Sequence, residues 1–254
     1  MRKGFTRTAL STVAFSCALA VTGLAATSSA QAASVTNNVI FGSGNANGGF
    51  TVIHVGGIEL GLRAKVRYPV PLNVFNYDGI NTYTFASGEG PSSRPLWNFE
   101  WSINSNYNGT GGVIDSYDYL LSLDTDPGPG ASYTVSFDPI HAFTFDNAFG
   151  TNSTGNGAGT VGTAGNYATL LATTNLAQNS WWYSLFDGSF DPNVNGNYAI
   201  KLSALDKQDH SNVIGTTQIN VVTTPVPGAM LLFASGLGAL GFARRKKLKK
   251  SEAA

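Results

Sequence analysis

The chain has 254 residues, and its 15 Lys and Arg balance its 15 Asp and Glu, so its formal charge at pH 7 is zero. This balance hides an asymmetry, because residues 34–224 hold six basic and fourteen acidic side chains, a difference of −8. Such an acidic body excludes nucleic acid as an expected partner, since nucleic-acid binding requires a clustered basic surface. The one cysteine, Cys17, precedes that body, which excludes a disulfide framework and a cysteine nucleophile there.

Residues 1–32 are predicted to form a secretory signal peptide. Three basic side chains within the first seven residues precede an apolar stretch at 9–26. Ala30 and Ala32 then form an A-x-A signal peptidase site. We therefore expect export through the Sec machinery, with the mature chain beginning near residue 33.

Residues 33–223 are predicted to form one secreted all-β domain, an antiparallel β-sandwich of jelly-roll or immunoglobulin-like type. Short apolar runs separated by Gly, Asn and Pro favour this architecture. The expected strands are 50–55, 58–67, 81–86, 97–103, 117–123, 133–137, 142–145, 198–205 and 213–222. Gly56 and Gly57 lie between the first two runs and predict a hairpin. The segment 167–178 combines leucines with β-branched threonines, so helix and strand are nearly balanced there.

The glycine-rich segment 150–165 is interpreted as a surface loop. It lacks the lysine of a phosphate-binding loop and has no strong βαβ context. An ATP site outside the inner membrane would also have little substrate.

Four tryptophans invite a sugar-binding interpretation, because indole rings stack on the apolar faces of sugars. Trp97 and Trp101 alternate with polar residues, as a sandwich core requires, and we assign both mainly to that core. Trp181 and Trp182 are adjacent, so on a strand one of the two rings must leave the core face. One of this pair is therefore the best candidate for a glycan or assembly contact.

Asp124 and Asp126, in the segment Asp-Thr-Asp-Pro-Gly-Pro-Gly, offer oxygen ligands of the kind that Ca²⁺ prefers. The spacing matches no EF-hand loop, and we favour a tight turn in which the aspartates cap backbone amides. The same is expected at 187–191 and 206–209. The three histidines, His54, His141 and His210, lack the short spacings of zinc sites. We therefore expect no cofactor, with Ca²⁺ at Asp124 and Asp126 as the alternative.

Glu59, Glu89 and Glu100 are the carboxylates that a glycoside hydrolase would pair with aspartates. No Gly-x-Ser-x-Gly elbow occurs in the sequence. We expect the protein not to be an enzyme.

Residues 224–254 have three consecutive parts. Pro225, Val226 and Pro227 allow a helix to begin only after them. Residues 228–243 carry no charge and predict a single short hydrophobic transmembrane helix. A basic block follows, with Arg244, Arg245, Lys246 and Lys247 at its start, and is expected to stay cytoplasmic. The alternative is a buried C-terminal helix of the domain, which rarely ends in such a block.

This three-part order resembles the PEP-CTERM sorting signal of Gram-negative bacteria that make extracellular polysaccharide. The sequence departs from the family pattern at Val226, where the usual residue is Glu. The body also resembles uncharacterised PEP-CTERM exoproteins, in the segments 97–101, 123–128, 178–181 and 190–193. The resemblance implies recognition by a membrane-embedded exosortase, transient insertion in the inner membrane, removal of the tail, and delivery to the cell surface or extracellular matrix.

The leading hypothesis is a structural or adhesive exoprotein that is retained in surface polysaccharide and supports a biofilm. A carbohydrate-binding module or lectin with Trp181 or Trp182 at its site is the first alternative. A secreted glycoside hydrolase is the second.

Overall fold

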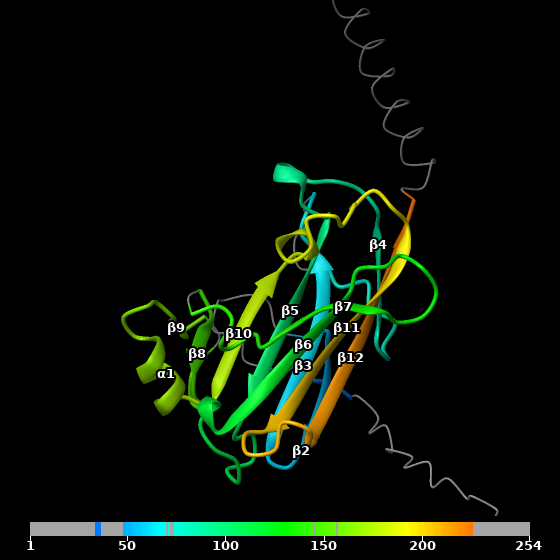
Figure 1. Cartoon of the computed structure of the whole chain (residues 1–254). Helices are drawn as coiled ribbons and strands as arrows, with labels where there is room; N and C mark the ends of the chain where they lie inside the picture. The colour runs from blue at the N-terminus through cyan, green and yellow to red at the C-terminus, as the bar shows by residue number, and fades with distance from the viewer. Residues whose placement is uncertain are drawn as a thin grey trace, which may run out of the picture. The chain divides into compact units, whose positions relative to one another are not determined.

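Two β-sheets face each other in the computed structural model, which describes residues 34–36, 48–69, 71, 74–144, 146–155 and 157–225 (Figure 1). Sheet A has the order β1-β2-β3-β5-β10-β8-β9, and sheet B has the order β4-β12-β11-β6-β7. The strands of sheet A are β1 (Ser34–Thr36), β2 (Phe50–Val55), β3 (Ile58–Val66), β5 (Trp97–Asn104), β8 (Ala148–Gly150), β9 (Thr160–Val161) and β10 (Leu176–Trp181). Those of sheet B are β4 (Thr82–Ala86), β6 (Tyr117–Asp124), β7 (Tyr133–Phe137), β11 (Gly196–Asp206) and β12 (Val213–Thr224). The predominantly β architecture confirms the predicted all-β class and is consistent with a β-sandwich.

The hairpin between β2 and β3 forms where the paired glycines predict it. Val55 pairs with Ile58, and Gly56 and Gly57 between them have φ angles of 56° and 83°. A two-residue turn of type I′, whose twist matches that of its strands, requires positive φ at both positions, and glycine adopts it without steric cost.

The core lies between the sheets and is built from alternate residues of each strand. Trp97, Phe99, Trp101 and Ile103 of β5 are at most 1% exposed. Sheet B contributes Leu121 and Leu123 of β6, Ile200 and Leu202 of β11, and Ile219 and Val221 of β12. The assignment of Trp97 and Trp101 to the core is therefore confirmed.

The segment 167–178, whose sequence pattern does not decide between helix and strand, contains both. Helix α1 (Tyr167–Thr173) comes first, and β10 then begins at Leu176. Short 3₁₀ turns η1 (Pro91–Ser93), η2 (Ile114–Ser116) and η3 (Tyr183–Leu185) complete the described elements. Helix α1 lies beside β8 and β9, at the edge of sheet A (Figure 1).

The strand predicted at 142–145 is absent from its described part, 142–144. The amide of Ala142 donates to the carbonyl of Asp138, which closes a turn after β7. Phe143 packs its ring against Phe137 and Trp181 at centroid distances of 5.5 and 5.6 Å. The apolar pattern thus reflects side chains that fold back onto the core from a turn.

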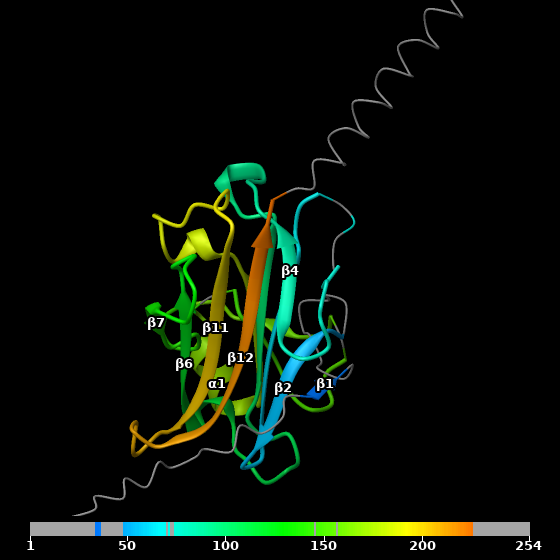
Figure 2. The same cartoon turned by 90° about the vertical axis from the view of Figure 1, so that its right-hand side faces the viewer.

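One strand pair departs from the predicted antiparallel arrangement. β4 runs parallel to β12, with Tyr83 opposite Val221, whereas the other named strand pairs are antiparallel (Figure 2). Most of the domain separates these two strands in sequence, so no hairpin constrains their relative direction.

Among the described residues, no helix has the length and apolar character needed to cross a membrane. The predicted hydrophobic helix at 228–243 lies outside the described residues, as does the signal peptide.

Candidate functional site

The face of sheet A that is turned away from sheet B is polar, although most of its side chains are buried. Strand alternation places Arg63 and Lys65 of β3 beside Asn98 and Glu100 of β5 on this outer face. All four are at most 3% exposed. Because an unpaired buried charge is costly, these groups must satisfy one another.

Glu100 lies at the centre of this buried group. Its carboxylate accepts a hydrogen bond from Arg63 and forms an ion pair with Lys65. The guanidinium of Arg63 also lies over the rings of Phe50 and Phe75, 4.1 and 4.6 Å from their centroids. Two cations therefore neutralise the Glu100 carboxylate, which suits a structural role better than proton transfer.

A pocket of about 240 Å³ opens on the outer face of sheet A, beside the end of β10. The side chains that give it chemical character are Arg67, Arg94, Asn98, Asp146, Gln178, Ser180 and Trp182. The amide of Asn98 donates to the hydroxyl of Ser180. Its carbonyl oxygen Oδ1 is buried and accepts no hydrogen bond among the described residues.

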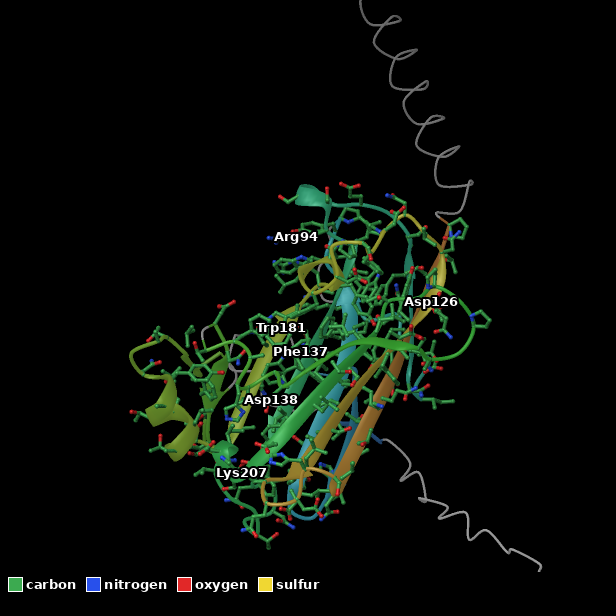
Figure 3. The ribbon with its side chains drawn as sticks, viewed as in Figure 1. Arg94, Asp126, Phe137, Asp138, Trp181 and Lys207 are labelled. Atoms are coloured by element: carbon green, nitrogen blue, oxygen red, sulfur yellow. The ribbon has the colours of Figure 1, made fainter. Side chains whose placement is uncertain are left out.

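Trp182 is the member of the tryptophan pair that leaves the core. Trp181 is 5% exposed and packs against Trp101 and Phe186, with both ring centroids 5.2 Å away (Figure 3). Trp182 is half-buried, and the guanidinium of Arg94 lies 3.8 Å from its ring centroid. The prediction that one ring must leave the core face is confirmed. This aromatic side chain lines the pocket together with two arginines.

A second, more open pocket of about 620 Å³ shares Arg94 and Trp182 with the first. Its other walls include Ser92, Ser184 and Asp191. The stacked pair therefore separates two neighbouring depressions.

The residues of these pockets match the chemistry of an acidic sugar. An indole offers an apolar face to a pyranose ring, and amides and hydroxyls hydrogen-bond its hydroxyl groups. Guanidinium groups bind carboxylates with two parallel hydrogen bonds. Arg67 and Arg94 are two of only six basic residues in the body, and they outnumber the one carboxylate of this pocket, Asp146, so the pocket lining carries a net charge of +1 on an acidic domain.

Glu59 and Glu100, two of the three glutamates considered for a glycosidase, do not form a pair with each other. Glu59 lies four residues along β3 from Arg63, the register partner of Glu100, which is about 13 Å of strand. Catalytic carboxylates in glycosidases are about 5–9.5 Å apart. Glu59 contacts His54 at 2.6 Å, and burial raises the pKa of the Glu59 carboxyl. Glu89 is exposed, near an isolated bridge to Pro95.

Asp124 and Asp126 form the turn that the sequence predicts. Oδ1 of Asp124 accepts from the amide of Asp126 at 3.1 Å, and Oδ1 of Asp126 accepts from the amide of Gly128 at 2.9 Å. Within the described part of the chain, no third carboxylate or histidine joins them in a metal-ligand group. The same capping occurs at Asp187 and Asp206.

The histidines occupy two separate places. His54 stacks on Tyr107, with ring centroids 4.0 Å apart. His141 and His210 each contact an aspartate, Asp138 and Asp118 respectively. The spacing of His141 and His210 in the sequence does not predict that both lie near this group of aspartates.

Most residues of the predicted sorting and processing sites lie outside the described residues. These are Ala30, Ala32, Val226, Pro227, Arg244, Arg245, Lys246 and Lys247. Pro225 is described and is exposed, directly after the end of β12.

No local pattern in the sequence marks Arg67, Arg94 or Asn98 as members of a site. The scarcity of basic residues in the body was the one available signal, but it does not show which of them converge. Comparison with known protein families, with curated proteins and with solved structures found no match for this chain.

Proposed function

We propose that this protein is an exported adhesive protein of the cell surface or extracellular matrix, and that it holds acidic polysaccharide in the pocket beside Trp182. The stacking of Arg94 on Trp182, 3.8 Å from the ring centroid, is the observation that carries the proposal. It places a cation and an aromatic surface together where a sugar carboxylate and a sugar ring would need them.

Sorting by an exosortase-type system belongs to the same proposal. A signal peptide, a Pro-Val-Pro break and an uncharged segment before a basic block support it. In this proposal the tail delivers the domain to the surface, where the domain, of jelly-roll or immunoglobulin-like type, contacts the matrix.

The charge of the pocket favours a carboxylated glycan over a neutral one. Arg67 and Arg94 both line it and outnumber its one carboxylate, Asp146. A neutral sugar would displace water from the two guanidinium groups without offering them a carboxylate in return. This uncompensated desolvation costs free energy.

Binding by the full chain to arrays of acidic and neutral glycans tests the proposal. We expect retention on uronic-acid polymers that is lost in Trp182→Ala and in Arg94→Gln. Tyr107→Ala is the matched control, because Tyr107 is an exposed aromatic residue that contacts His54 and lines neither pocket. Equal binding by Trp182→Ala and the wild-type protein would overturn the assignment of the site.

Sorting is tested separately, in cells. Substitution of Pro225 and Pro227, or of the four basic residues 244–247, should block tail removal and surface delivery. Unchanged processing in both sets of variants would reject the sorting part of the proposal and leave the glycan site untouched.

A further inference from the structure

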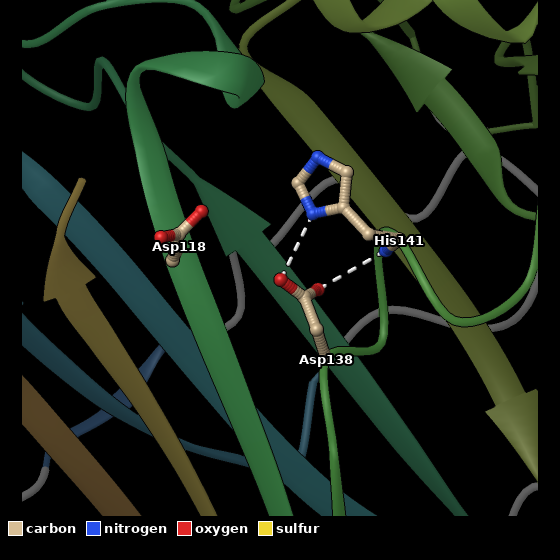
Figure 4. Close-up of side chains that lie close together, drawn as sticks. All are labelled: Asp118, Asp138 and His141. Atoms are coloured by element: carbon tan, nitrogen blue, oxygen red, sulfur yellow. Dashed lines mark hydrogen bonds and ion pairs between the residues drawn. The ribbon is translucent and has the colours of Figure 1, made fainter. Parts of the chain in front are cut away.

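Asp118, Asp138 and His141 bring three metal-ligating side chains together away from the pocket. One ligand atom of each residue lies within 4.8 Å of those of the other two (Figure 4). Asp118 lies near the start of β6, and Asp138 directly follows β7, which pairs with β6. Figure 3 shows Asp138 and Lys207 toward the end of the domain opposite to Arg94.

The chain holds Asp138 and His141 in a fixed turn. Oδ1 of Asp138 accepts from the amides of Ile140 and His141, at 2.7 and 3.1 Å. Its other oxygen, Oδ2, lies 2.9 Å from Nδ1 of His141. The turn therefore holds one carboxylate oxygen and one imidazole nitrogen next to each other.

A second layer of polar groups surrounds these three side chains. Nδ1 of His210, from the β11–β12 hairpin, lies 2.7 Å from Oδ2 of Asp118. Oδ1 of Asp115 lies 3.4 Å from Nε2 of His141 and 2.6 Å from Nζ of Lys207. The partners of the ligands are thus supplied by η2 and by the hairpin.

The charges of this group do not balance when the imidazoles are neutral. Lys207 compensates Asp115, which leaves Asp118 and Asp138 as two carboxylates facing two histidines. Two bound protons or one divalent cation would supply the missing positive charge.

We propose that Asp118, Asp138 and His141 bind a divalent transition-metal ion of the zinc class. His210 and Asp115 act as outer partners that orient the ligands, as is usual around such ions.

An imidazole and two carboxylates favour zinc over calcium. Ca²⁺ takes six to eight oxygen ligands, whereas Zn²⁺ accepts nitrogen and oxygen with about four ligands at about 2.0–2.2 Å. The ligands of a tetrahedral zinc ion lie about 3.3 Å apart, as follows from those bond lengths. Ligand atoms within 4.8 Å of one another need only a small side-chain closure to reach this geometry. Water would complete the coordination.

Protons compete with the metal for the same atoms. The hydrogen bond from His141 to Asp138 raises the pKa of the imidazole, and burial opposes this effect. Asp115, Asp118, Asp138, Lys207 and His210 are the charged or titratable groups placed around the two imidazoles.

A wild-type measurement tests the site without any substitution. The untagged full chain contains three histidines, so nitrogen-15 labelling of histidine gives three assignable imidazoles. We expect one equivalent of Zn²⁺ to shift the ring signals of His141 and to leave those of His54 unchanged. His54 is the internal control, because it contacts Glu59 rather than the group around Asp138.

Variants identify the ligands. His141→Ala and Asp118→Asn should each weaken zinc binding, measured by competition with a chromophoric chelator, by more than the roughly 10–100-fold expected for loss of an outer partner. His210→Ala should fall within that range. Asp209→Asn is the matched control, since Asp209 is an exposed carboxylate of the same hairpin that caps Ser211.

Absence of one-to-one zinc binding by the wild-type chain, or shifts of His54 equal to those of His141, would overturn the proposal. Unchanged affinity in both ligand variants would do the same. Because the labelling experiment uses the unaltered chain, a variant that fails to fold does not leave the question open.

Discussion

The guanidinium of Arg94 lies 3.8 Å from the ring centroid of Trp182, and both residues line the two neighbouring pockets. Arg94 follows the turn η1, and Trp182 follows β10, so two distant segments meet in this contact. The contact fixes the position of the only arginine shared by both pockets.

Loss of this contact should reduce stability only slightly. Arg94→Ala is expected to lower the free energy of unfolding by about 0.5–1 kcal/mol, the usual size of a partly exposed cation–π contact. Arg67→Ala is the comparison, because Arg67 lines the same pocket but lies 5.9 Å from the Tyr68 ring centroid. Urea unfolding measures both. An equal loss in the two variants would contradict a specific role for the Arg94–Trp182 contact.

Removal of the charge on Glu100 should be far more costly. Glu100→Gln leaves Arg63 and Lys65 buried without their carboxylate, and we expect a loss of about 3–5 kcal/mol in the free energy of unfolding. Asp126→Asn, which alters an exposed carboxylate in a turn, should change it by less than about 1 kcal/mol. Denaturant unfolding of Glu100→Gln and Asp126→Asn measures this difference in the free energy of unfolding. A small effect of Glu100→Gln would show that the buried charges find other compensation.

The raised pKa of His141 predicts a pH-dependent contribution to stability in metal-free protein. A group whose pKa is higher in the folded state contributes fully below its unfolded pKa of about 6.5, and the contribution disappears as the pH rises through the folded pKa. The pKa of Asp115, lowered chiefly by Lys207, acts in the opposite direction but at more acidic pH, near its unfolded value of about 3.9.

Wild-type protein and His141→Gln, both with excess chelator, provide the measurement. The difference in their free energies of unfolding should be larger at about pH 6 than above about pH 8. A constant difference across this interval would contradict the assignment of the effect to His141.

Two glycines at positive φ should differ in their tolerance of alanine. A Cβ at Gly57 would lie 2.6 Å from Oγ1 of Thr110, whereas a Cβ at Gly79 would meet nothing within 4 Å. Gly79→Ala should cost about 1–2 kcal/mol from backbone strain alone, and Gly57→Ala should cost more. Thermal and denaturant unfolding of both variants measure the two losses in stability. A larger loss for Gly79→Ala than for Gly57→Ala would contradict the prediction.

The sequence predicted those parts of the fold that depend on local pattern. The alternation from Trp97 to Ile103 and the glycine pair at 56 and 57 locate β5 and the first hairpin. The partner and direction of β4 depend instead on contacts across the whole domain, and a local pattern carries no information about them.

At the two candidate sites, too, the sequence predicts what depends on local pattern and not what depends on contacts between distant segments. Alternation alone requires one of Trp181 and Trp182 to leave the core face, but the presence of Arg94 against Trp182 results from the path of a distant loop. His141 and His210 are 69 positions apart, and a hairpin between β11 and β12 brings His210 to the Asp118 side chain that His141 also approaches.

The position of β12 has a mechanical consequence for a protein whose C-terminal segment is predicted to pass into a membrane. β12 is hydrogen-bonded along one side to β11 and along the other to β4, and it ends one residue before Pro225. Tension applied beyond Pro225 would pull this strand along its own axis. Many hydrogen bonds on both sides would then bear the load together, instead of opening one after another. The domain is built to resist traction at its C-terminal end.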